Sequence, residues 1–219
     1  MITIGEIVKE IIQNSPFLEE SLADDLINIS SLARKIKPQI EKKLQKEIQI
    51  GAIIMAIKRI EPGYYHKINI GLKNFVNNIG DFIVRSDLMD STFENSKTLI
   101  SRQLNLLKII GENQKIFYSV SRGIFETTLI VSNSIKNDVN TIFASEKMIS
   151  QKFGLSSITI KLPEENTEIS GFYYFILKNL AWENINIVEI ISTTNEFTIL
   201  VKDKDIDKAF SILLKLKKT

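Results

Sequence analysis

The chain has 219 residues, of which 44% are hydrophobic and 25% charged, and its formal net charge is +2. This composition is typical of a globular protein and excludes a disordered or fibrous chain. The chain has no cysteine and one histidine, His66. This excludes a disulfide framework, a thiolate metal site and any site that needs two imidazoles, so we expect neither a metal nor a cofactor.

The N-terminal segment carries no signal for export. It lacks a basic stretch followed by an apolar run and a small-residue cleavage site, so we expect no signal peptide. The longest uncharged apolar stretch, near residues 48–57, is shorter than the roughly 18–20 residues that a membrane span needs. We therefore expect a cytoplasmic protein with no membrane contact.

Residues 1–62 have helical periodicity throughout and predict an N-terminal helical domain. Ser15 and Pro16 form a helix start, because serine caps free amides and proline fits the first turn. Pro38 lies inside the third segment, where we expect it to interrupt or restart the helix by removing a donor. The predicted helices cover about residues 4–12, 16–26, 28–44 and 49–60.

Several short helices separated by turns are typical of a helix-turn-helix or winged-helix domain. Residues 1–27 have one lysine and six acidic residues, a net charge of −5, whereas residues 28–60 have eight basic and two acidic residues, a net charge of +6. The basic half would hold a recognition helix, and its cations could neutralise phosphates. These cations are Arg34, Lys35, Lys37, Lys42, Lys43 and Lys46. Because the whole domain is near neutral, the solvated face of a dimerising bundle is the other interpretation.

Residues 63–80 form a transition bounded by Gly63 and Gly80. His66 lies in this segment, with no second ligand type or nucleophile near it in the sequence. We therefore expect a structural or solvent-facing role for His66.

From residue 81 onward the pattern becomes mixed and occurs twice, which predicts two units over residues 81–150 and 151–219. Each unit has the order strand, helix, strand, strand, helix. In the first unit these elements cover residues 81–87, 93–110, 115–121, 124–133 and 135–144. In the second unit they cover residues 155–161, 171–182, 185–192, 196–201 and 206–216. A strand borrowed from the other unit or from the transition would complete βαββαβ, the ferredoxin-like arrangement of an α+β protein.

The second unit resembles an ACT domain, and more narrowly the ACT domains in the regulatory region of aspartate kinases. Residues 180–193 carry most of this resemblance, since they contain the phrases Asn-Ile-Asn-Ile and Glu-Ile-Ile-Ser. Residues 157–160, 169–171, 197–201 and 206–210 add to it. The first unit fits the same frame but lacks the Asn-Ile-Asn-Ile phrase. The resemblance implies a ligand-sensing module of amino-acid metabolism.

The resemblance also implies where an amino-acid effector would bind. In ACT domains the effector lies at an interface between two units, where amides at a helix N-terminus attract its carboxylate. By motif matching, Ile169, Ser170 and Gly171 would contact the carboxylate side, and Asn184, Ile185 and Asn186 the other side. In the first unit Asp87, Asp90 and Ser91 would occupy the corresponding loop. The competing interpretation is that both units bind nothing and serve for dimerisation.

Catalysis by an aspartate kinase is unsupported, because the sequence has no glycine-rich phosphate loop and its first 80 residues are helical. We therefore expect a non-catalytic regulatory protein, acting as a homodimer, in which an amino acid sensed by tandem ACT-like units controls a helical domain that binds DNA. The alternative is a regulatory subunit or assembly module that docks on an amino-acid biosynthetic enzyme, such as an aspartate kinase, with its basic helices contacting protein and not DNA.

Overall fold

The computed structural model describes residues 2–60, 72, 75–113 and 115–217. The chain divides into two compact units, Met1–Asn74 and Phe75–Thr219. His66 and most of the expected transition segment lie outside the described residues.

The N-terminal unit is helical, as the periodicity predicts. Its helices are α1 (Ile4–Gln13), α2 (Pro16–Ala23), α3 (Ile29–Leu44) and α4 (Ile50–Lys58). Thr3 and Glu6 form a capping box at the start of α1, each side chain bonding to the backbone N–H of the other. Helix α4 packs against both α1 and α3. The buried core residues of this unit are Ile7, Val8, Ile12, Leu32, Ala33, Ile36, Ile40, Ile48, Ile53 and Ile57.

The expected break at Pro38 is wrong, because α3 continues through this residue. A proline inside a helix leaves the carbonyl four residues earlier without its usual donor. Pro38 and Arg34 both lie on the exposed side of α3, so water can solvate the Arg34 carbonyl. The buried residues of α3 on the opposite side hold the helix against the core.

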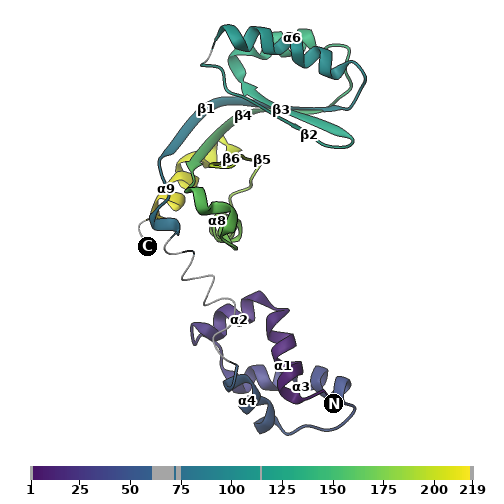
Figure 1. Cartoon of the computed structure of the whole chain (residues 1–219), viewed down its shortest axis with the longest axis vertical. Helices are drawn as coiled ribbons and strands as arrows, with labels where there is room; N and C mark the ends of the chain where they lie inside the picture. The colour runs from purple at the N-terminus through teal and green to yellow at the C-terminus, as the bar shows by residue number, and fades with distance from the viewer. Residues whose placement is uncertain (1, 61–71, 73–74, 114, 218–219) are drawn as a thin grey trace. The chain divides into compact units, whose positions relative to one another are not determined.

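The second unit contains one six-stranded antiparallel sheet in the order β2-β3-β1-β4-β6-β5 (Figure 1). Its strands are β1 (Phe82–Glu94), β2 (Tyr118–Arg122), β3 (Glu126–Ser132), β4 (Met148–Lys161), β5 (Glu189–Ser192) and β6 (Glu196–Lys202). Its α-helices include α6 (Leu99–Glu112), α7 (Lys136–Ile142), α8 (Phe172–Trp182) and α9 (Ile206–Leu216), and residues 75–77 are also helical. Short 3-10 turns, η1 (Asn133–Ile135), η2 (Glu164–Glu168) and η3 (Asp203–Asp205), precede α7, α8 and α9.

The sheet consists of two ferredoxin-like halves that share β1 and β4. The first half is residues 88–152, and the second half is residues 155–216 together with residues 82–85. The start of β4 pairs with residues 88–93 and is the fourth strand of the first half. Residues 82–85 of β1 pair with the end of β4 and are the fourth strand of the second half. The expected βαββαβ frames, each completed by a borrowed strand, are thus confirmed. The boundary expected at residues 150/151 falls inside β4.

The two halves match closely from the third strand onward. Strand β6, turn η3 and helix α9 begin 70 residues after β3, η1 and α7. Threonine hydroxyls bond across neighbouring strands in both halves, Thr92 with Thr128 at 3.0 Å and Thr159 with Thr198 at 2.8 Å. Each position in one half can therefore be compared with its equivalent in the other.

The sheet changes direction where the halves meet. The register between β1 and β4 shifts on both sides of Leu88, and Asp87 and Gly154 have positive φ angles of 58° and 65°. Register irregularities of this kind bend a strand and increase its twist. Leu88, Ile130, Leu155 and Leu200 form a buried cluster beside the bend, which joins the two halves.

Candidate functional site

The turn that follows α8 contains three of the predicted ligand residues, Asn184, Ile185 and Asn186. The Ile185 N–H donates to the Leu180 carbonyl (3.0 Å), and the Asn184 N–H donates to the Ala181 carbonyl (2.9 Å). This pair of bonds is a common helix end, in which the residue after the helix has a left-handed backbone. Asn184 is that residue, with a φ of 57°. Asparagine tolerates this conformation better than most residues. Asn184 therefore has a structural reason to be present, and Ile185 is buried beside it.

This turn borders an open pocket of about 540 Å³. The opposite wall is the end of β6 and the start of α9. The Asn184 and Asn186 side chains are exposed, and neither makes a side-chain hydrogen bond to another described residue. The residues that line the pocket are Glu183, Asn184, Ile185, Asn186, Lys202, Lys204, Asp205 and Lys208.

Three lysines and two acidic residues supply the charge of this pocket. The Lys208 Nζ lies 2.8 Å from the Glu183 Oε2 and also donates to the Glu183 carbonyl at 2.9 Å. The hydrogen bond and charge of Lys208 lower the pKa of Glu183, and the charge of Lys215 adds to this effect. Lys202 and Lys204 have no ion-pair partner in the part of the chain that the structure describes. The pocket therefore offers cations, amide groups and one further carboxylate, that of Asp205.

The other predicted ligand residues of the second half, Ile169, Ser170 and Gly171, lie at the opposite end of α8. Gly171 is the residue before the helix and has a φ of 88°, which favours glycine there. Helix α8 has 11 residues, so its ends are about 16 Å apart at roughly 1.5 Å per residue. Within one chain the structure does not bring these two groups of predicted residues together.

The expected loop at Asp87, Asp90 and Ser91 is wrong, because all three residues belong to β1. Asp87 accepts a hydrogen bond from the Asn133 Nδ2 at 3.0 Å, and Ser91 accepts one from the Gln151 Nε2 at 3.1 Å. The Asp90 side chain is fully buried and lies 3.2 Å from the Lys152 Nζ. Its other oxygen, Oδ1, has no partner among the described residues.

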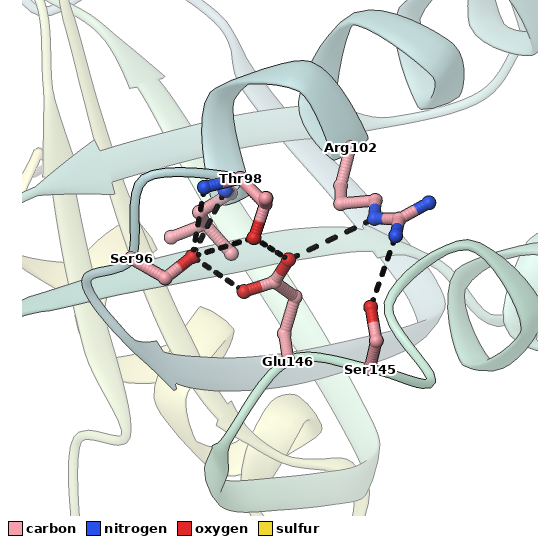
Figure 2. A network of polar contacts seen from close by, with 6 residues as sticks. Ser96, Thr98, Arg102, Ser145 and Glu146 are labelled. Atoms are coloured by element: carbon pink, nitrogen blue, oxygen red, sulfur yellow. Dashed lines mark hydrogen bonds and ion pairs between the residues drawn. The ribbon is translucent and has the colours of Figure 1, made fainter.

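The segment that does join β1 to α6 contributes two hydroxyl groups to a network around a distant carboxylate (Figure 2). The Glu146 side chain is 2% exposed and accepts hydrogen bonds from the Ser96 and Thr98 hydroxyls at 2.6 and 2.7 Å. The Ser96 hydroxyl in turn accepts the Leu99 N–H at the start of α6 at 3.0 Å. Arg102 lies 3.7 Å from Glu146 and donates to the Ser145 hydroxyl.

These contacts lower the pKa of Glu146, chiefly through the Ser96 and Thr98 hydrogen bonds. We did not predict this network from the sequence. The serine and threonine just before Leu99 were a usable sign of a helix start. Their partner, Glu146, is about 50 residues away and no local pattern identifies it.

The predicted phosphate-contacting residues all lie on or just after α3. Two of them are paired within the helical unit, Lys37 with Glu41 at 3.4 Å and Lys43 with Glu10 at 2.6 Å. Arg34 donates to the Ser31 hydroxyl. Lys35, Lys42 and Lys46 are exposed and have no ion pair with any described residue. The structure therefore leaves four of the six cations, those of Arg34, Lys35, Lys42 and Lys46, without an ion-pair partner among the described residues.

Two further properties can be stated for residues 2–60, 72, 75–113 and 115–217. No group of three or more His, Cys, Asp or Glu residues is placed to hold a metal ion. No helix is both long and apolar enough to cross a membrane.

Comparison with known proteins finds similarity in structure alone. No family model and no curated protein matches the chain. The regulatory subunit of aspartate kinase from Thermus thermophilus, in its ligand-free form, has a TM-score of 0.51 at 8% identity, covering 63% of this chain and 97% of that one. A chain from a structure of aspartokinase alpha and beta subunits has a TM-score of 0.51 at 13% identity, covering 64% of this chain and 99% of its own.

The aspartate kinase of Clostridium acetobutylicum has a TM-score of 0.52 at 14% identity over 63% of this chain, which spans only 34% of that enzyme's length. At such identities the similarity shows the fold. These comparisons do not identify the N-terminal helices, and a helix-turn-helix type for them stays a prediction. The protein is thus an α+β protein in which a helical region precedes a six-stranded sheet with the fold of aspartate kinase regulatory ACT domains.

Proposed function

We propose that the protein is a non-catalytic regulator that senses an amino acid through its second ferredoxin-like half. The observation that carries this proposal is the open pocket beside Asn184 and Asn186, whose amide groups have no side-chain partners among the described residues. The similarity to a separate regulatory subunit supports it, because this fold occurs there as a chain of its own.

A ligand in this pocket could affect the rest of the sheet through strands β6 and β4. It would join the turn after α8 to the end of β6 and the start of α9. Strand β6 pairs with β4, and β4 continues into the first half. A change in the second half would therefore bias the bend between the halves, provided that the ligand binds the two bend geometries with different affinity.

The test is a thermal-shift panel of the twenty amino acids on the full chain. A ligand that binds the folded state raises Tm with its concentration. We expect one amino acid, or one group of related amino acids, to do so, and Asn186→Ala to reduce the shift at equal concentration without lowering the ligand-free Tm. Asn179→Ala, on α8 but outside the pocket, is the control for nonspecific effects. A flat panel would contradict the proposal.

For the helical unit we propose binding to DNA through the outer side of α3. Lys35, Lys42 and Lys46 support this, since they are exposed and have no ion-pair partner within the described chain. Phosphate contacts predict that affinity falls steeply as salt rises. We expect Lys35→Glu/Lys42→Glu to weaken binding to a mixed-sequence duplex at least about tenfold and to flatten the salt dependence, whereas Lys37→Glu has a smaller effect because Lys37 is already paired. Equal binding by both variants would contradict the proposal.

The alternative is docking on an amino-acid biosynthetic enzyme. The near-complete coverage of a chain described as a regulatory subunit favours it. Under this alternative the basic helices contact the enzyme instead of DNA, so Lys35→Glu/Lys42→Glu weakens binding to the enzyme, and no DNA binding is seen. A homodimer also stays a prediction. The exposed apolar residues Ile100, Leu104 and Leu107 on α6 offer a surface for it.

A further inference from the structure

The charge of the pocket in the second half goes beyond what a neutral amino acid requires. Lys202, Lys204 and Lys208 surround one depression of about 540 Å³. Lys208 is held by Glu183 at 2.8 Å, so its charge is largely compensated. Lys202 and Lys204 have no ion pair with any described residue, and their ammonium groups raise the positive potential of the pocket.

The fold itself does not require these lysines. The elements β6, η3 and α9 match β3, η1 and α7 with an offset of 70 residues. The positions of the three lysines therefore correspond to Ser132, Ser134 and Asp138 in the first half. None of these residues is basic, yet the first half forms the same strand, turn and helix. The cations are therefore a property of this pocket and not of the ferredoxin-like frame.

The pocket also contains a carboxylate that is available to a ligand. Asp205 lines the pocket and has no ion pair with a described residue, so it can accept an ammonium group. Two free cations, one free carboxylate and two asparagine amides are complementary to a molecule with two acidic groups and one amino group.

We infer that the pocket binds an α-amino acid that carries a second acidic group, a carboxylate or a phosphate. Lys202 and Lys204 bind the two acidic groups, Asp205 binds the ammonium group, and Asn184 and Asn186 supply hydrogen bonds. This inference rests on the proposed function and specifies the class of its ligand.

The test is a titration followed by the fluorescence of Trp182, the one tryptophan of the chain. Trp182 is 80% exposed and directly precedes Glu183, which lines the pocket. The ligands are aspartate, glutamate, O-phosphoserine, succinate, asparagine and lysine. We expect saturable binding of at least one acidic amino acid, at least about tenfold weaker binding of succinate, and little binding of asparagine or lysine. Comparing the two carboxylic amino acids with O-phosphoserine identifies the second acidic group.

Variants assign the effect to the lysines. Lys202→Met/Lys204→Met should weaken binding of the acidic ligand at least about tenfold, while Lys108→Met/Lys115→Met, an equal change of charge in the first half, leaves it unchanged. Added salt should also weaken binding. If asparagine or lysine binds best with a dependence on Asn186 but not on the two lysines, the inference is overturned and the proposed function stands. If none of these ligands binds but another of the twenty amino acids raises Tm, the inference also fails and the proposed function stands; if none of the twenty binds, both fail.

Discussion

Replacing Glu146 with alanine is expected to lower the unfolding free energy of the sheet-bearing unit by about 3 kcal/mol, since a hydrogen bond to a charged group contributes roughly 1.5–3 kcal/mol. Glu146 accepts two hydroxyl hydrogen bonds that hold the start of α6, and Arg102 loses its carboxylate partner as well. Urea denaturation followed by circular dichroism measures the change. Glu126→Ala removes an exposed carboxylate of the same half and should change stability by less than about 0.5 kcal/mol. Equal effects of the two replacements would show that the network is not stabilising.

The same residue gives the stability a defined pH dependence. Because the folded state lowers the pKa of Glu146 below its ordinary value of 4.5, its ionised form stabilises the fold at any pH above that value. This contribution is lost as the pH falls through the lowered pKa of the folded state. The difference between the wild type and Glu146→Gln should therefore be largest near neutral pH and shrink in acid.

Replacing Lys152 with methionine is expected to have a similarly large effect, about 3 kcal/mol at pH 7, because it leaves the buried Asp90 carboxylate without its cation. The Asp90 side chain is fully buried, with Lys152 3.2 Å away. Glu189 adds to this loss of stability. Burial and the charge of Asp90 raise the pKa of Glu189, whereas the charge of Lys152 lowers it, so removing Lys152 raises this pKa further. Ionising a carboxyl group whose pKa is raised by folding destabilises the folded state as the pH rises. The variant should therefore lose stability relative to the wild type at higher pH.

A double-mutant cycle separates the ion pair from other effects of the replacement. Asp90→Asn/Lys152→Met should be more stable than Lys152→Met alone, because the unpaired charge is gone. Lys161→Met, an exposed lysine on the same strand, is the matched control. If Lys152→Met is as stable as this control, Asp90 does not depend on its partner.

The sequence predicts elements well where a repeating pattern meets one core. Helix α9 has the predicted bounds, residues 206–216, because Ala209 and Leu213 form one buried stripe. Strand β6 is a short run of five buried residues, 197–201, between the exposed residues Glu196 and Lys202. Both elements lie on the regular part of the second half, where local periodicity and tertiary packing agree.

The wrong predictions concern residues whose hydrogen-bond partners are distant in the sequence. Asp87, Asp90 and Ser91 are polar and resemble a loop, yet each bonds to a residue distant in the sequence, Asn133 in η1 or Lys152 and Gln151 in β4. The early part of β4 was missed because its side chains are mostly exposed and do not alternate. In the candidate site, the phrase around Asn184 and Asn186 located one wall of the pocket. The lysines of the other wall, Lys202, Lys204 and Lys208, have no local pattern that links them to it.

The central claim is that the second half senses an amino acid at the turn after α8. The most direct measurement is a crystal structure of the full chain grown with the amino acid that gives the largest thermal shift. We predict that the ligand lies between Asn186 and the lysines at the end of β6 and the start of α9. A ligand bound elsewhere on the chain, with this pocket empty at saturating concentration, would contradict it.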